Sequence, residues 1–243
     1  MLPDTTPVIE QIERLVADIP GWSPVDQLYT LYTLAVLSSN LGGDLLEVGS
    51  WCGRSTSVLG LAARRAGLTR LQCVDLFPAR EDWRRNPDGS YSMSVTIDGR
   101  TYTSYDDQTV WAEPFERDIA PLYETHASIL DVFRTTVART GVADLVSAYR
   151  GTLQDFAASA AAASFRCRLA FIDGDHGYQA VRADIDTADR LLLQGGWLCL
   201  DDAFSSYLGV DQAITECILN NPRYELGHQM TRKLFVARKR RGS

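Results

Sequence analysis

Short apolar runs alternate along the chain with longer segments in which apolar residues recur every three or four positions. The longer segments predict four amphipathic helices, over 24–40, 54–67, 178–196 and 208–220. A further, alanine-rich helix is expected directly after the run 145–151. Glycine pairs at 42–43 and 195–196 lie where the first and third of these helices are expected to end. The short runs are typical of seven β-strands, over 44–49, 70–77, 145–151, 168–173, 197–202, 223–229 and 232–238.

The order of these elements predicts the fold class. Apolar strands that alternate with helices form parallel sheets with helices on both faces. The last two strands lie close enough in sequence to pair as an antiparallel hairpin. We therefore expect one α/β domain over 1–243, with a Rossmann-like, doubly wound, mostly parallel seven-stranded sheet and a C-terminal antiparallel hairpin. Such sheets bind ligands at the carboxyl ends of their strands.

Residues 78–127 interrupt the alternation. They show little helical periodicity, and an alternating stretch around Asp98-Gly99 predicts a β-hairpin. The segment carries seven aromatic residues: Trp83, Tyr91, Tyr102, Tyr105, Trp111, Phe115 and Tyr123. Because it follows the second strand, it can fold over the ligand edge as a cap or lid insertion. A solvated insertion and a dimer contact are the alternatives.

Composition restricts the class of partner. The chain has 243 residues, 45% apolar content and a net charge of −7, so it has no broad basic field for nucleic acid or an anionic membrane. The basic run at 238–241 predicts a solvated tail. Five scattered cysteines, no targeting pattern and no long apolar span lead us to expect a cytoplasmic protein that binds a small molecule. A homo-oligomer is also possible.

The stretch LEVGSWCGRST joins the first strand to the next helix. Gly49 permits a tight turn, Gly53 permits close approach of a ligand, and Ser50 and Ser55 can donate hydrogen bonds. The spacing G-x-x-x-G differs from the dinucleotide fingerprint G-x-G-x-x-G, and Glu47 precedes it. A carboxylate there suits a cationic amino group better than a pyrophosphate.

Acidic residues end several of the predicted strands. Asp75 ends the second strand, where it can accept hydrogen bonds from ribose hydroxyls. Asp173 ends the fourth strand, and Asp201 and Asp202 end the fifth. Three carboxylates on neighbouring strand tips require a compensating positive charge, and oxygen ligands favour Mg²⁺, with Mn²⁺ or Ca²⁺ possible. The alternative is that these acids only cap helices or face solvent.

His176 follows Asp173 by three residues in the stretch FIDGDHGY. A neutral imidazole near pH 7 can take a proton from a hydroxyl as its oxygen attacks, so His176 is a candidate general base. A purely structural histidine is the alternative. Asp175 can orient His176, assist the cofactor or cap the following helix.

Four stretches, LEVGSWCGRST, VDLF, FIDGDHGYQAVRADI and GGWLCLDD, resemble the class I S-adenosylmethionine-dependent methyltransferases. The similarity is strongest to the antibiotic-sugar and cephamycin-type O-methyltransferases, with catechol O-methyltransferases as more distant relatives. It spans 24–239 except for 78–127.

The resemblance assigns roles to individual residues. It implies that Asp75 holds the ribose, and that Gly151 and Thr152 contact the adenine. It implies a metal on Asp173, Asp201 and Asp202, with Asp173 also near the cofactor, and a catalytic His176. The residues implied at the methionine end of the cofactor are Glu47, Gly49, Ser50, Gly53 and Ser55.

The sequence therefore predicts a magnesium-dependent O-methyltransferase that acts on a small hydroxylated acceptor, such as the sugar moiety of a natural product. A metal-independent methyltransferase is one alternative. A metal-dependent nucleotide-sugar enzyme is another, because DGD resembles the D-x-D motif of glycosyltransferases, although it would leave Glu47 and the glycine loop without a task. The missing G-x-G-x-x-G argues against an NAD(P)-linked oxidoreductase. A non-enzymatic binding module is a further alternative.

Overall fold

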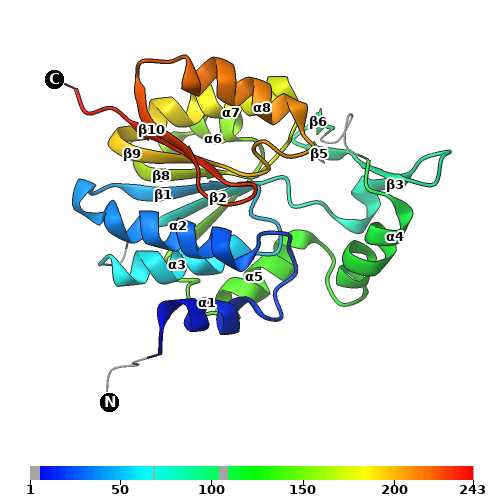
Figure 1. Ribbon diagram of the computed structural model, residues 1–243. Helices are drawn as coiled ribbons and strands as arrows, with labels where there is room; N and C mark the ends of the chain where they lie inside the picture. The colour runs from blue at the N-terminus through cyan, green and yellow to red at the C-terminus, as the bar shows by residue number, and fades with distance from the viewer. Residues whose placement is uncertain (1–5, 68, 104–108, 243) are drawn as a thin grey trace.

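The computed structural model describes residues 6–67, 69–103 and 109–242. Its centre is a seven-stranded sheet, shown in Figure 1. Across the sheet the strands are β10 (Tyr224–Gln229), β11 (Phe235–Lys239), β9 (Leu192–Leu200), β8 (Cys167–Ile172), β1 (Asp44–Val48), β2 (Leu71–Asp75) and β7 (Val146–Arg150). The pairs among β9, β8, β1, β2 and β7 are parallel, whereas β11 runs antiparallel to both β9 and β10. The predicted fold class is confirmed.

Helices cover both faces of the sheet (Figure 1). One face carries α1 (Val8–Val16), α2 (Val25–Leu37), α3 (Arg54–Arg65) and α5 (Ile129–Arg139), and the other carries α6 (Leu153–Ala158), α7 (Tyr178–Leu191) and α8 (Leu208–Ile214). Each layer packs on its own apolar cluster. The central strand β8 is apolar almost throughout and is buried at all six positions, as expected for a strand that is covered by helices on both faces. Two 3₁₀ turns, Ser39–Leu41 and Ala160–Ala162, follow α2 and α6, and a π-helical turn, Thr215–Leu219, continues α8.

The junction between α7 and β9 differs from the prediction. The helix ends at Leu191 and the strand begins at Leu192, so the glycine pair lies inside the strand. Gly195 has φ 83°, and the pairing of β9 with β8 shifts register at this point. A side chain on Gly196 would lie 2.9 Å from the Arg168 carbonyl oxygen. These glycines therefore form a bulge in a buried strand, because the left-handed backbone at Gly195 favours glycine and a side chain at Gly196 does not fit easily.

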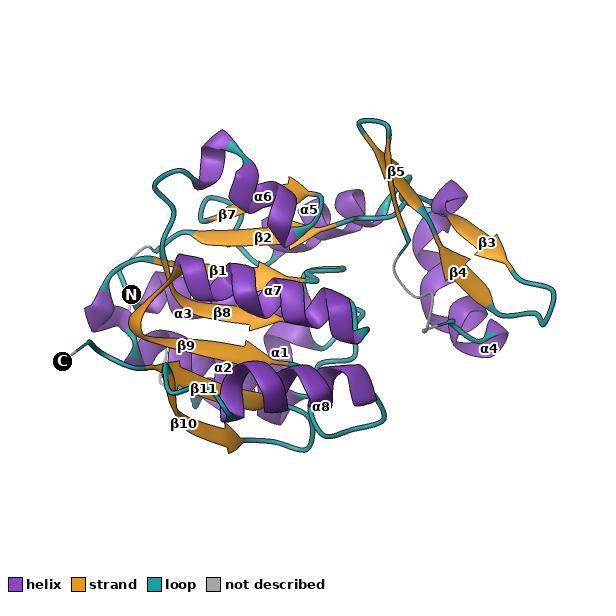
Figure 2. Cartoon of the chain, turned by 90° about the horizontal axis from the view of Figure 1, so that it is seen from above, coloured by secondary structure: helices purple, strands orange, loops and turns teal. Residues whose placement is uncertain are grey.

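The described residues of the segment 78–127 form a separate layer beyond the carboxyl ends of the strands (Figure 2). The layer contains the strands β3 (Trp83–Arg85), β4 (Tyr91–Met93), β5 (Val95–Ile97) and β6 (Arg100–Tyr102), the helical turn α4 (Ala112–Pro114), the π-helical turn Phe115–Ile119, and the 3₁₀ turns Arg80–Asp82 and Ala120–Glu124. It has its own buried cluster, in which the Tyr91 and Phe115 rings stack 3.7 Å apart. The hairpin at Asp98-Gly99 is confirmed, with both turn residues at positive φ. Tyr105 lies outside the described residues.

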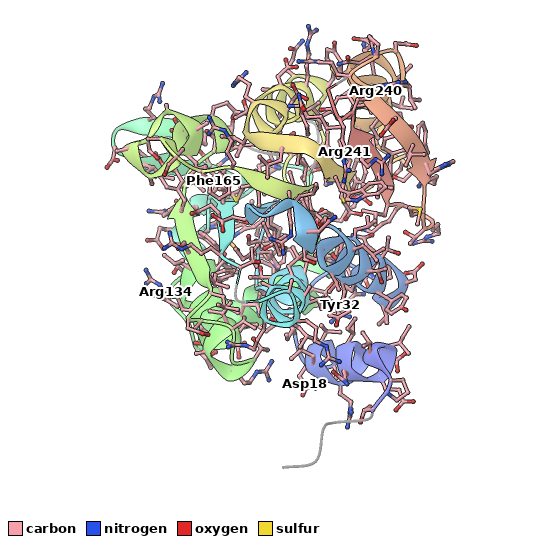
Figure 3. All side chains as sticks on the ribbon, turned by 90° about the vertical axis from the view of Figure 1, so that its left-hand side faces the viewer. Asp18, Tyr32, Arg134, Phe165, Arg240 and Arg241 are labelled. Atoms are coloured by element: carbon pink, nitrogen blue, oxygen red, sulfur yellow. The ribbon has the colours of Figure 1, made fainter. Side chains whose placement is uncertain are left out.

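The basic C-terminal run differs from the solvated tail that the sequence predicts. Arg238 and Lys239 belong to β11, and the Arg238 guanidinium lies 2.6 Å from a carboxylate oxygen of Glu225. Figure 3 views the opposite edge of the sheet from the 78–127 layer and places Arg240 and Arg241 there. None of the helices in the described ranges has the length and apolar character needed to span a membrane.

Candidate active site

A cavity of about 660 Å³ opens at the carboxyl ends of β1, β2, β8 and β9. The sheet supplies its floor, because the loops that leave these four strands all line it. The 78–127 layer supplies part of its wall through Met93, Tyr102 and Trp111, and the segment before α2 adds Trp22. The cavity therefore lies where the fold class places ligands.

The loop between β1 and α3 forms one side of the cavity. Gly49 has φ 84°, and a Cβ atom there would lie 1.9 Å from the carbonyl oxygen of Asp173, so only glycine fits. Gly53 has φ 87° and precedes α3 directly. Ser50 and Ser55 are buried and line the cavity. The structure brings these four predicted residues together with the N-terminus of α3, whose backbone N–H groups can bind a ligand.

Glu47 lies beneath the loop and does not line the cavity. Its side chain is fully buried, and it accepts hydrogen bonds from the Thr56 hydroxyl and, at 3.4 Å, from the Cys73 thiol. Burial raises the pKa of its carboxyl group, although neighbouring hydroxyls partly offset the effect. Glu47 therefore does not contact the cavity directly. It binds Thr56 and so helps to hold α3, whose N-terminus borders the cavity.

Asp75 lies at the end of β2 and faces the cavity. Its two carboxylate oxygens accept hydrogen bonds from the backbone N–H groups of Trp51, at 2.9 Å, and Phe77, at 2.6 Å. Burial raises the pKa of this carboxyl group, and the backbone donors oppose the rise. Gly151 and Thr152 line the same part of the cavity, and the Gly151 N–H donates to the Asp75 carbonyl at 3.0 Å. These contacts hold Asp75 in place while leaving it acceptor capacity for ligand hydroxyls.

The acidic residues of β8 and β9 meet at the other end of the cavity, as the sequence predicts, but a lysine joins them. Lys233 Nζ lies 2.8 Å from Asp201 Oδ2 and 3.2 Å from Asp202 Oδ1. The lysine comes from the turn between β10 and β11, and its side chain is 11% exposed. No motif in the sequence points to this lysine. The available signal was that lysine occurs at only two positions, 233 and 239, among 24 basic residues.

The charges in this cluster are distributed unevenly. Burial, and next the Asp201 carboxylate, raise the pKa of Asp173 well above its usual value, and Lys233 only partly opposes this. Burial also disfavours ionisation of Asp202, but His176 and Lys233 outweigh it, so the pKa of Asp202 falls. His176 and Lys233 therefore favour the charged form of Asp202, whereas burial and the Asp201 carboxylate favour the neutral form of Asp173.

One subset of this cluster could hold a metal ion. Among the described residues, Asp173, His176 and Asp202 each offer a ligand atom, and these atoms lie within 4.8 Å of one another. Asp201 is outside this subset. Lys233 binds its Oδ2 atom, and its other oxygen, Oδ1, is buried without a hydrogen-bond partner among the described residues. Carboxylate oxygens are the donors that Mg²⁺ prefers, so the residues present fit a divalent cation.

His176 is held against Asp202 and Tyr207. Its Nε2 atom lies 3.0 Å from Asp202 Oδ2, and its ring stacks on the Tyr207 ring at 4.2 Å with an interplanar angle of 13°. The side chain is 12% exposed and lines the cavity. Asp175 accepts a hydrogen bond from the Gly177 N–H at 2.6 Å, which shapes the turn before α7. Asp175 therefore shapes the backbone next to His176.

Tryptophans from separate segments also line the cavity. Trp22 and Trp51 lie 5.9 Å apart, and Trp22 and Trp111 are 58% and 63% exposed. Arg54 binds the segment that carries Trp22, because its guanidinium donates to the carbonyls of Val16, Ile19 and Ser23. Trp51 and Arg54 belong to the stretch LEVGSWCGRST and Trp111 to the aromatic segment 78–127, whereas Trp22 lies outside the motifs and no local pattern singles it out.

A buried acid on α7 makes the stability depend on pH. Burial raises the pKa of Asp184 to about 7, with an opposing hydrogen bond from Gln154 and a further rise from Asp175. Since the unfolded carboxyl titrates near 4, the unfolded state loses its proton first, and stability falls as pH rises from about 4 to about 7. We expect Asp184→Asn to stabilise the protein by roughly 2 to 4 kcal/mol at pH 8 and by little at pH 4.

Urea unfolding of the Asp184→Asn variant across this pH range measures the effect. The exposed Asp186 on the same helix supplies the control, Asp186→Asn, whose stability should follow the wild type. An Asp184→Asn advantage that does not grow with pH would contradict the prediction.

Comparison with known proteins identifies the family. The chain matches the methyltransferase domain family over residues 46–203. Its fold resembles the O-methyltransferase NovP, with a TM-score of 0.61, 16% identity and coverage of 89% of this chain and 81% of that one. It also resembles an O-methyltransferase from Bacillus cereus (TM-score 0.55, 16% identity, 98% and 94% covered) and TomG from Streptomyces achromogenes (TM-score 0.55, 14% identity, 99% and 92% covered). The chain belongs to the methyltransferase domain family and is a class I, S-adenosylmethionine-dependent methyltransferase.

Proposed function

We propose that this methyltransferase is magnesium-dependent and methylates a hydroxyl group of a small acceptor, such as the sugar moiety of a natural product or a similar secondary metabolite. One observation carries the proposal. A single cavity joins the loop 49–52 and Asp75 at one end to Asp173, Asp201, Asp202 and His176 at the other. A methyl donor and an acceptor hydroxyl can therefore lie in one cavity, where orientation supplies much of the rate enhancement.

The donor would occupy the side of the cavity formed by β1, β2 and α6. The loop 49–53 and Ser55 would surround its methionine end, and Glu47 would hold that loop from below through α3. Asp75 would accept hydrogen bonds from the ribose hydroxyls, and Gly151 and Thr152 would lie at the adenine. A backbone that is already fixed loses little conformational entropy when it binds the cofactor.

The acceptor hydroxyl would lie beside the acidic cluster. Asp173 and Asp202 would hold the divalent cation, with Asp201 next to them. When bound, the metal lowers the pKa of the acceptor hydroxyl and fixes its direction, and S-adenosylmethionine supplies the methyl group. His176 would accept the hydroxyl proton on its imidazole ring. The Asp202 carboxylate, 3.0 Å from Nε2, would orient the ring and stabilise the imidazolium.

The walls of the cavity support an acceptor with an apolar face. Trp22, Trp51 and Trp111 offer flat apolar surfaces on which a ring can stack. The acceptor would enter beneath the 78–127 layer, which would act as a cap and exclude water from the reaction. Two structural neighbours are consistent with a secondary metabolite: TomG is involved in tomaymycin synthesis, and CalS11 is a calicheamicin methyltransferase.

Calorimetry with S-adenosylhomocysteine tests the cofactor site. We expect cofactor-stripped protein to bind this ligand, and Asp75→Asn to weaken binding by roughly tenfold to a hundredfold, because hydrogen bonds to a charged acceptor contribute about 1.5 to 3 kcal/mol. Asp18→Asn is the control, since Asp18 is exposed and is not among the residues that line the cavity. The proposal fails if the stripped wild-type protein does not bind the ligand.

Chelation tests the metal separately. Thorough removal of divalent cations should reduce methyl transfer by at least about tenfold, because no metal would then lower the pKa of the acceptor hydroxyl. Added Mg²⁺ should restore the rate, while S-adenosylhomocysteine binding should change little. Full activity after chelation would remove the metal from the mechanism and leave the methyltransferase assignment intact.

A further inference from the structure

Lys233 is placed where a metal ion would otherwise neutralise the acidic cluster. Its ammonium group lies 2.8 Å from Asp201 Oδ2 and 3.2 Å from Asp202 Oδ1, so it bridges the two carboxylates that end β9. The next residue towards the N-terminus, Arg232, is exposed. The turn between β10 and β11 therefore directs one of its two basic side chains into the site and leaves the other in solvent.

The backbone fixes the position of Lys233. The Ala203 N–H donates to the Lys233 carbonyl oxygen at 2.9 Å, which ties the turn to the loop that follows Asp202. Leu234, the next residue, is fully buried in the core beneath the sheet. A lysine side chain held in this way loses less conformational entropy when it forms an ion pair than an exposed lysine does.

Lys233 and a metal ion would compete for the same carboxylate oxygens in this cluster. Asp201 has a side chain 1% exposed, with one oxygen bound to Lys233 and the other without a hydrogen-bond partner among the described residues. The subset able to surround one ion, Asp173, His176 and Asp202, shares Asp202 with the lysine. An ion that binds Asp202 would place two cations on one carboxylate, and their repulsion in a buried site is strong.

We propose that Lys233 is a built-in counter-cation that competes with the divalent metal for the Asp201 and Asp202 carboxylates. Without metal, its ammonium group neutralises the carboxylates and keeps the acidic strand ends together. When metal binds, the ammonium group moves away from Asp202, and the Asp201 oxygen it held becomes available to the ion. This inference rests on the metal part of the proposed function and not on the methyltransferase assignment.

Metal affinity measures the competition directly. Calorimetric titration with Mn²⁺ at one mildly alkaline pH compares the wild type with Lys233→Met, which keeps the length of the apolar stem without the charge. We expect Lys233→Met to bind Mn²⁺ more tightly by roughly tenfold or more, a usual scale for coupled binding events. Arg232→Met is the matched control and should bind Mn²⁺ as the wild type does. Equal or weaker binding by Lys233→Met overturns the proposal.

A second measurement covers the case in which Lys233→Met does not fold. Lys233 and Lys239 are the only lysines in the sequence, so protein labelled with ¹³C at lysine Cε gives two side-chain signals. Lys239 lies outside the cluster, where its ammonium group binds the backbone carbonyls of Asp189 and Leu192 and the Asp189 carboxylate. The variant Lys239→Arg lacks one of the two signals and so shows which signal belongs to which lysine. Saturating Mg²⁺ should shift the Lys233 signal of the wild type and leave the Lys239 signal unchanged. No shift at Lys233 overturns the proposal.

Cofactor binding separates the two possible failures. Each variant is also titrated with S-adenosylhomocysteine, whose proposed site is at the other end of the cavity. If that binding is normal and Lys233→Met gains no metal affinity, the proposed role of Lys233 as a counter-cation is wrong, and the assignment as a methyltransferase is unaffected. If neither the wild type nor Lys233→Met binds metal, both the counter-cation role of Lys233 and the proposed metal requirement are wrong. If S-adenosylhomocysteine binds neither the wild type nor Lys233→Met, the proposed cofactor site is wrong.

Discussion

Replacing His176 with alanine is expected to lower kcat for methyl transfer by roughly a hundredfold to ten-thousandfold, the usual contribution of a positioned general base. The reason is the ring's place in the cavity, 3.0 Å from Asp202 Oδ2 and stacked on Tyr207. Release of S-adenosylhomocysteine at saturating acceptor measures the rate. Binding of S-adenosylhomocysteine should stay close to the wild-type value, because Asp75 and the glycine loop lie at the other end of the cavity.

Two controls distinguish a base from a structural histidine. His228, which is exposed on β10, can be changed to alanine without an effect on kcat. Added imidazole should restore part of the rate of His176→Ala, because a small base can enter the space left by the ring, whereas a structural defect would not respond. Near-normal turnover by His176→Ala would exclude His176 as the base.

Gly49→Ala is expected to have the largest effect on stability. A Cβ atom at this position would lie 1.9 Å from the Asp173 carbonyl oxygen, and φ is 84°. The obstacle is backbone, so it cannot move aside as a flexible side chain could. We expect a loss of at least about 4 kcal/mol in the free energy of unfolding, or failure to fold, together with loss of S-adenosylhomocysteine binding.

Gly141→Ala separates backbone strain from steric overlap. Gly141 follows α5 at φ 71°, and a Cβ atom added there would meet nothing within 4 Å, so its cost should be only the roughly 1 to 2 kcal/mol of the left-handed conformation. Urea unfolding measures both variants. If Gly49→Ala is as stable as Gly141→Ala, the loop that carries Gly49 can move away from Asp173 without a loss of stability, and the prediction is wrong.

Local patterns in the sequence predicted most of the sheet. All seven strands occur near their expected positions, because continuous apolar runs of this length are buried in parallel sheets. The same patterns did not predict two helices, α1 and α5. For α5 a signal was present: Ser128 and Asp131 form a capping box, with the Asp131 N–H donating to the Ser128 hydroxyl at 3.3 Å and the Ser128 N–H donating to the Asp131 carboxylate at 3.1 Å.

The end of α7 shows why a local rule failed. A glycine pair after a helical repeat normally ends a helix, and the apolar run at 191–193 continues the helical pattern equally well. The strand partner β8 decides the outcome, because pairing with it buries Leu192 and makes room for a bulge at Gly195. Pairing between strands is a long-range interaction, and the residues on one strand do not specify it alone.

By itself the sequence determined the strand–helix order, the glycine loop and the acids at the strand ends, since each depends on neighbours a few positions apart. Only the tertiary structure decided which charges meet. Lys233 follows Asp202 by some thirty residues, and Trp22 precedes the glycine loop by a similar distance, yet both line the cavity. The pairing of β11 with β9 brings Lys233 to Asp201, and the guanidinium of Arg54 holds the segment of Trp22. The physical reason is that burial and charge pairing act through space, whereas helix and strand periodicity act along the chain.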